Sequence, residues 1–180
     1  MPARAAAAKR YAQAAFQLAK AAGQFDTWQR DLGALATLVS DEQTVQLLTS
    51  PKLSLDSRTQ AVSKVVPGIS ALAVNLTQVL MAKGRVRLLP EIATEYQLLL
   101  DAQRGIQHAT VVSAVPLQPE LRERLSRALS ERVGKTVVLD SAVDPAITGG
   151  LIVRVGDEII DGSTRSRLEG MRRLLVGRVG

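Results

Sequence analysis

The sequence contains no cysteine and few aromatic residues. Disulfides and thiolate metal sites are therefore excluded. Aromatic residues make up 3% of the 180 residues, so the core must be aliphatic and rich in alanine, which favours packed helices over an aromatic-lined ligand pocket. The longest apolar stretch, 69–82, contains polar residues and is shorter than the ~20 residues that a membrane span needs. The first residues also lack the apolar centre of a signal peptide, so we expect a soluble chain.

The sequence also lacks the common catalytic patterns. Phosphate-binding loops of the form GxxxxGK[ST], the dinucleotide pattern GxGxxG and the nucleophile pattern GxSxG are all absent. The single histidine, His108, has no evident catalytic partner, which favours a structural role. Asp157 falls in a turn, and Glu158 and Asp161 fall on opposite faces of one strand, so their oxygens should not converge on a cation. The sequence predicts no catalytic residue, no cofactor and no metal.

The net charge of +6 indicates an anionic partner but does not identify it. The basic excess is spread: residues 1–105 carry twelve basic and eight acidic side chains, and residues 106–180 carry eleven and nine. Arginines near the end could contact phosphates, but no aromatic residue lies among them for base stacking, which favours solvent or a protein surface. A basic nucleic-acid-binding protein remains the alternative hypothesis.

The first part of the chain has helical periodicity throughout. Breaks at glycine and proline divide it into six predicted helices joined by short connections, which is typical of a helical bundle. Pro90 should lie in the first turn of the last of these helices or kink it. The fifth helix is the most apolar, so we expect it to be central and packed on several sides. The six ranges are 4–22, 25–39, 42–48, 54–66, 69–83 and 86–104.

Small residues mark one face of the first helix. Ala8, Ala12, Ala15 and Ala19 recur at helical spacing, and we expect Leu18 to share that broad face. A face this shallow can receive an amphipathic helix from a partner. It can equally allow close packing inside the bundle. The sequence leaves both interpretations open.

The pattern changes after Gly105. A run rich in β-branched residues, 108–115, predicts a strand. An amphipathic helix over 119–133 and a second strand over 135–143 follow. The order strand, helix, three strands, helix predicts a small α/β domain, 106–180, behind a helical domain, 1–105. The predicted fold class is therefore α+β with two domains: an N-terminal six-helix bundle, then a small α/β domain with a β-hairpin and a C-terminal helix.

The pair Gly156-Asp157 separates two β-rich runs, which is typical of a two-residue hairpin turn. This loop sets a register in which Val155 faces Glu158 and Val153 faces Ile160. Leu151, Val153 and Ile160 then form an apolar face that needs cover. Ser163 is placed to cap a following Arg-rich amphipathic helix, which could fold back over the hairpin.

Two segments resemble one known family. The C-terminal stretch from Gly149 to Leu175, GGLIVRVGDEIIDGSTRSRLEGMRRLL, is similar to the end of the δ subunit of bacterial F-type ATP synthases, the counterpart of the mitochondrial oligomycin-sensitivity-conferring protein. The stretch KRYAQAAFQLA, from Lys9 to Ala19, resembles the opening helix of that family. The two segments occur in the same order as in the family and are separated by a similar number of residues, so the resemblance covers the whole chain.

The resemblance implies a non-catalytic stator subunit in the peripheral stalk of a proton- or sodium-translocating F-type ATP synthase. Its helical domain would bind the N-terminal helices of the α subunits, and its second domain would bind the b subunits of the stalk. We expect one copy per complex, at the cytoplasmic face of the bacterial cell membrane, with membrane contact only through the complex and no nucleic acid. The implied α-binding residues are Tyr11, Ala14, Ala15, Trp28, Asn75, Leu76 and Val79, and the implied stalk-binding residues are Arg165, Arg167 and Leu168.

Overall fold

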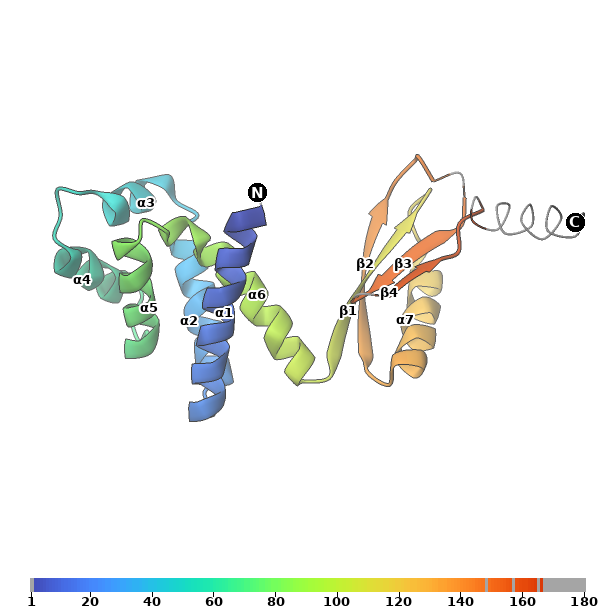
Figure 1. Cartoon of the computed structure of the whole chain (residues 1–180), viewed down its shortest axis with the longest axis horizontal. Coiled ribbons are helices and arrows are strands. Elements are labelled where there is room, and N and C mark those ends of the chain that lie inside the picture. The colour runs from blue at the N-terminus through green and yellow to red at the C-terminus, as the bar shows by residue number, and fades with distance from the viewer. Residues whose placement is uncertain (1, 148, 157, 165, 167–180) are drawn as a thin grey trace, which may run out of the picture. The chain divides into compact units, whose positions relative to one another are not determined.

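The structure is a computed structural model that describes residues 2–147, 149–156, 158–164 and 166. The chain divides into two compact units, Met1–Leu100 and Asp101–Gly180, each with a hydrophobic cluster of its own. Helices dominate the first unit, and a four-stranded sheet with one described helix makes up the second, so the fold class is α+β (Figure 1). None of the described helices combines the length and the apolar run required to span a bilayer.

The helices of the first part follow the predicted order closely. Asp41 and Ser54 cap α3 and α4 through their side chains, and both residue types are favoured at that position. Pro90 is the second residue of α6, so the prediction of a first-turn position is confirmed. A short 3₁₀ turn, η1 (Val86–Leu88), precedes that helix. The bounds are α1 (Pro2–Ala22), α2 (Phe25–Leu38), α3 (Glu42–Thr49), α4 (Leu55–Val65), α5 (Ala71–Ala82) and α6 (Leu89–Gln103).

The core of the first unit is built on small and aliphatic side chains. Ala8, Ala12, Ala15 and Ala19 of α1 are buried in it, so internal packing uses the alanine face. Three aromatic rings join α1, α2 and α6: the ring centre of Phe16 lies 5.4 Å from that of Phe25 and 5.9 Å from that of Tyr96. The Tyr96 hydroxyl donates to the Phe25 carbonyl at 3.0 Å. All five aromatic residues of the chain lie between positions 11 and 96.

A buried carboxylate joins α2 to the start of α5. Asp31 is only 1% exposed, and its Oδ2 accepts a hydrogen bond from the backbone amide of Ser70 at 2.9 Å. Its Oδ1 accepts from Arg30 Nη2 at 3.0 Å. The Ser70 hydroxyl in turn accepts from the amide of Ala73 at 3.3 Å and caps the helix. A negative charge at a helix N-terminus is favourable, so Asp31 fixes where α5 begins.

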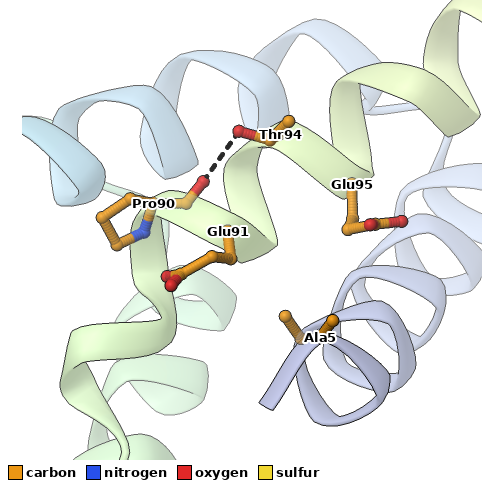
Figure 2. Close-up of a pocket in the computed structure, with 6 residues that line it drawn as sticks. Ala5, Pro90, Glu91, Thr94 and Glu95 are labelled. Atoms are coloured by element: carbon orange, nitrogen blue, oxygen red, sulfur yellow. Dashed lines mark hydrogen bonds between the residues drawn. The ribbon is translucent and has the colours of Figure 1, made fainter. Parts of the chain in front are cut away.

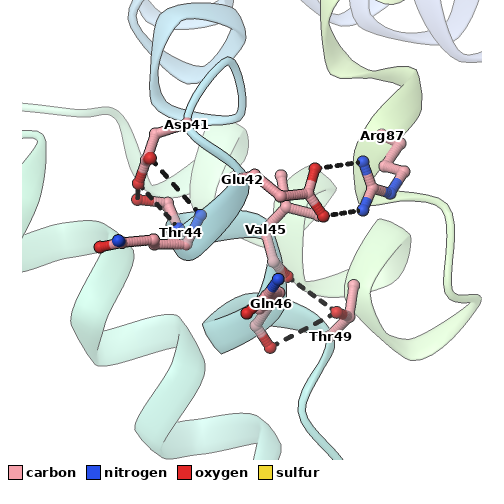
Figure 3. Close-up of polar contacts among 8 residues, drawn as sticks. Asp41, Glu42, Thr44, Val45, Gln46, Thr49 and Arg87 are labelled. Carbon is pink, nitrogen blue, oxygen red and sulfur yellow. Dashed lines mark hydrogen bonds and ion pairs between the residues drawn. The ribbon is translucent and has the colours of Figure 1, made fainter.

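A second polar group joins the start of α3 to η1 (Figure 3). Arg87 donates from both terminal nitrogens to the two oxygens of Glu42, one of them at 2.8 Å. This hydrogen-bonded pairing lowers the pKa of Glu42 from its ordinary value of 4.5 and raises the pKa of Arg87. Asp41 accepts from the hydroxyl and the amide of Thr44, and these bonds lower its pKa from 3.8. Both carboxylates therefore favour the folded state in their ionised form.

Burial in the first unit differs from the prediction at Leu18. The apolar helix α5 packs against α2, α4 and η1, as expected of a helix packed on several sides, although Leu72 and Val79 on its outer side are 40% and 48% exposed. Leu18 of α1 does not share the buried alanine face and is 48% exposed. Helical spacing placed Leu18 on that face, but the neighbouring helices cover a narrower stripe than its position requires.

The second unit is a mixed sheet in the order β2-β1-β3-β4. The first strand, β1 (Ile106–Ser113), pairs in parallel with β2 (Thr136–Val143) and antiparallel with β3 (Leu151–Val155). The helix α7 (Pro119–Val133) connects β1 to β2, because parallel neighbours need a crossover. Gly134 ends this helix in the left-handed conformation, with φ of 70°.

The predicted hairpin register is confirmed. In the pairing of β3 with β4 (Glu158–Asp161), Val155 faces Glu158 and Val153 faces Ile160. The apolar face that includes Val153 packs against Leu125 and Leu129 of α7, so this helix supplies its cover. The C-terminal helix predicted for that role falls mostly outside the described residues. Its cap is described: the Ser163 hydroxyl accepts from the amide of Ser166 at 3.3 Å.

Candidate partner-binding surface

An apolar stripe runs along the outer side of α5. Leu72, Leu76 and Val79 recur at intervals of four and three residues, which places them on one side of a helix, and Asn75 lies exposed beside them. The opposite side supplies the core residues Ala73, Thr77, Leu80 and Met81. The Thr77 hydroxyl satisfies itself by donating to the Ala73 carbonyl at 2.8 Å. Leu72 and Val79 are therefore largely surplus to the internal packing of the unit, whereas Leu76 is partly buried against its core.

A second stripe follows α1. Tyr11 is half-buried, and Ala14 and Leu18 are exposed at the same helical spacing. The Tyr11 hydroxyl accepts from Arg85 Nη1 at 3.4 Å, which joins α1 to the chain just after α5. Helix α2 packs against both α1 and α5, and Tyr11 and Leu76 contact the same hydrophobic cluster. The two apolar stripes therefore belong to helices that share one hydrophobic core.

Ala15 and Trp28 lie beneath this surface rather than on it. Ala15 is buried, and Trp28 of α2 is only 1% exposed. The indole Nε1 of Trp28 is buried without a hydrogen-bond partner in the described part of the chain.

The surface suits an apolar helix as its ligand. Its named side chains carry no formal charge, and the guanidinium of Arg85 lies at its Tyr11 end. Exposed leucine and valine on α5 and exposed leucine on α1 provide anchoring points for residues at helical spacing on a partner. Leu18 and Leu72 extend the surface beyond the residues expected from sequence. The signal for Leu72 is its spacing of four and seven residues from Leu76 and Val79.

The stalk-binding residues that the resemblance implies, Arg165, Arg167 and Leu168, lie outside the described residues, as does Asp157 of the hairpin turn. Within the described segment before them, Asp161 accepts from the amide of Ser163 at 2.9 Å and from the hydroxyl of Ser166. These bonds lower the pKa of Asp161, and they show this carboxylate organising the start of the segment that follows.

His108 does have partners, contrary to expectation. Its Nε2 lies 2.8 Å from Oδ2 of Asp101, which is buried in the last turn of α6, and its Nδ1 lies 3.7 Å from Oδ2 of Asp140 on β2. Sequence reasoning missed them because the carboxylates come from a helix and a neighbouring strand. The two cavities described in the first unit do not include His108. No group of three or more possible metal ligands occurs in the described part of the chain.

Comparison with known proteins places this chain in a family. Residues 7–175 match the family of the ATP synthase delta (OSCP) subunit. A protein named ATP synthase subunit delta from Desulfotalea psychrophila is 35% identical over 95% of this chain and 96% of its own length. One of the same name from Thioalkalivibrio sulfidiphilus is 38% identical over 91% and 93%.

A solved structure shares the fold. A chain in the cryo-EM structure of the Toxoplasma gondii mitochondrial ATP synthase hexamer superposes with a TM-score of 0.62 over 94% of this chain and 97% of its own, at 22% identity. At that identity the likeness shows the fold alone. Together with the sequence matches over nearly the whole length, it shows that the chain belongs to the ATP synthase delta (OSCP) family, the structural, non-catalytic subunits of the peripheral stalk.

Proposed function

We propose that the chain is the link between the catalytic head and the b-type stalk of an F-type ATP synthase. The unit Met1–Leu100, as the family's six-helix bundle, binds the N-terminal helices of the α subunits. The unit Asp101–Gly180 binds the b subunits. Each complex contains one copy, on the cytoplasmic side of the bacterial cell membrane, and this copy is attached to the membrane only through the other subunits of the complex. The head is then held against rotor torque while protons or sodium ions drive the rotor.

The observation that carries the first half of this proposal is the exposed stripe on α5. Leu72, Leu76 and Val79 are apolar and lie in one row, and Leu72 and Val79 contribute little to the core. Removing such a row from water against an apolar helix is favourable by roughly 25 cal/mol per Å² of apolar surface. Tyr11, Ala14 and Asn75 extend the contact, and Ala15 and Trp28 support it from below.

Two separate units also suit the mechanical role. When one of two linked units is bound to its partner, the other unit is held near its own partner at a high effective concentration. Family membership gives the nucleic-acid alternative no support. The second contact is assigned to Arg165, Arg167 and Leu168 by resemblance.

A peptide titration tests the first contact. A synthetic peptide of the α-subunit N-terminus should change the emission of Trp28, because a helix docked above this indole alters its surroundings. Val79→Asp should weaken binding about tenfold or more, since it places a charge in the apolar contact. Leu47→Asp is the matched control, because Leu47 is similarly exposed but lies on α3. Equal affinity of wild type and Val79→Asp would contradict the assignment.

A pull-down with the C-terminal part of a b subunit tests the second contact. Arg165→Glu combined with Arg167→Glu should reduce retention of the full chain. Arg127→Glu makes the same kind of charge change on α7, where Arg127 lies 4.0 Å from the exposed Glu123, and should leave retention unchanged. Retention that survives the double reversal would place the stalk contact elsewhere on the chain.

A further inference from the structure

A hollow lies between the first turns of α1 and α6 (Figure 2). It measures about 250 Å³ and is lined by Ala5 and Ala8 on one side and by Pro90, Glu91, Thr94 and Glu95 on the other. Liquid water occupies about 30 Å³ per molecule, so this hollow has room for a long side chain. Ala5 and Ala14 are nine residues apart, which puts them on opposite sides of α1 at about 100° per residue. The hollow is therefore distinct from the surface formed with α5.

Two carboxylates share this hollow with one cation. Oε1 of Glu91 lies 2.7 Å from Nη2 of Arg4, and the same nitrogen donates to the carbonyl of Arg87 at 2.8 Å. Oε2 of Glu91 is buried without a hydrogen-bond partner among the described residues. Glu95, four residues along the same helix, makes no hydrogen bond or ion pair in the described part of the chain. The Glu91 side chain as a whole is 41% exposed and is paired with Arg4, so the acceptor left without a partner among the described residues of the hollow is the half-buried Glu95 carboxylate.

We propose that the hollow between α1 and α6 binds a lysine or arginine side chain of a partner protein. Such a side chain places its aliphatic stem against Ala5, Ala8 and Pro90, as long basic side chains do on apolar surfaces. Its N–H groups then donate to Glu95 and lie near the Glu91 carboxylate, and charge-assisted hydrogen bonds of this kind are strong. A bare divalent cation fits poorly, because two carboxylates supply too few converging oxygens. An anion would be repelled.

The site is unusual for the charge balance of this chain. The protein as a whole is basic, with a net charge of +6, yet Glu91 and Glu95 outnumber Arg4 here. A basic partner that most of this surface repels is attracted at this point, so the hollow selects orientation as well as partner. The inference adds a contact to the proposed function and uses a different face of α1.

Two short helical peptides provide the probe. Both carry an alanine-rich apolar face, one with lysine at its centre and the other with norleucine, which keeps the stem and removes the charge. The full chain should bind the lysine peptide about tenfold more tightly, the usual value of one charge-assisted hydrogen bond. Amide NMR shifts should change at Ala5, Ala8 and Thr94. Glu95→Gln should abolish the preference without loss of folding, since Glu95 has no described partner to lose.

Charge reversal makes the test sharper. Glu95→Lys should reverse the selectivity, so that a peptide with glutamate at the same position binds best. Glu123→Lys, the same change on exposed α7, should leave the lysine preference intact. Equal affinity of wild type for the lysine and norleucine peptides would overturn the proposal, as would a preference that survives Glu95→Gln. Self-association of the chain that Glu95→Gln abolishes would also overturn it, because the occupant would then be a second copy. The effect of Val79→Asp on binding of the α-subunit peptide tests the proposed function separately, because Val79 lies outside the hollow.

Discussion

Asp31 holds the start of a helix that lies 39 residues further along the chain, because its Oδ2 accepts from the Ser70 amide at 2.9 Å. Asp31→Ala should destabilise the first unit by about 2 kcal/mol, since it leaves that amide without an acceptor and removes a charge from the start of α5. Thermal unfolding followed by circular dichroism should show a Tm lower by roughly 10 °C. Asp31→Asn keeps an acceptor oxygen and should lose less.

Exposed Glu131 on α7 provides the control for this variant. Glu131→Gln should change stability by less than about 0.5 kcal/mol. An Asp31→Ala protein as stable as this control would show that the link between α2 and α5 contributes nothing.

Acid should weaken the junction between α3 and η1. The pKa values of Asp41 and Glu42 are both lowered in the folded chain, so their contribution is complete above the ordinary values of 3.8 and 4.5. It is lost as the pH falls through the lowered folded values. The Tm of wild type should therefore fall below about pH 4.5 faster than that of Glu42→Gln, and the two should converge. Parallel Tm curves from pH 7 to pH 3 would contradict this.

Gly150→Ala should destabilise the second unit. Gly150 has φ of 88°, and a Cβ there would meet the backbone carbonyl of Gly162, which cannot move aside as a side chain could. The expected loss is about 1–3 kcal/mol in chemical denaturation. Gly33→Ala gives the opposite sign: Gly33 lies inside α2 with open space at its Cβ position, so alanine should stabilise by up to about 1 kcal/mol.

Neighbouring residues of α5 should differ sharply in their effect on stability. Leu80 is fully buried, so Leu80→Ala should cost about 2–5 kcal/mol. Val79→Ala should cost less than about 1 kcal/mol, because nearly half of Val79 is exposed. Urea denaturation of the two variants measures the contrast. A large loss for Val79→Ala would mean that the stripe on α5 serves the core and is not reserved for a partner.

Local signals predicted the elements well. The hairpin register follows from one Gly-Asp pair and alternating side chains, and the order of the first six helices follows from helical periodicity and its breaks at glycine and proline. Long-range contacts were not predictable. Neither Asp31 with Ser70 nor His108 with Asp101 leaves a periodic signal, because each pair depends on how elements pack.

The candidate surface illustrates the same division. Tyr11, Asn75, Leu76 and Val79 were expected from the family resemblance, whereas the exposure of Leu18 and Leu72 depends on how many helices surround α1 and α5. Apolar content alone placed α5 at the centre of the unit, because an apolar residue reserved for a partner looks the same in sequence as one reserved for the core.

Every aromatic ring of the chain lies between positions 11 and 96, so all of its aromatic chromophores belong to the helical unit. Near-ultraviolet absorbance, fluorescence and near-ultraviolet dichroism all originate in the helical unit, while the sheet contributes only its backbone signal in the far ultraviolet. Thermal unfolding recorded in both the near and the far ultraviolet therefore separates the helical unit from the sheet without any label. The substitution Val143→Trp would give the sheet a fluorescence signal of its own.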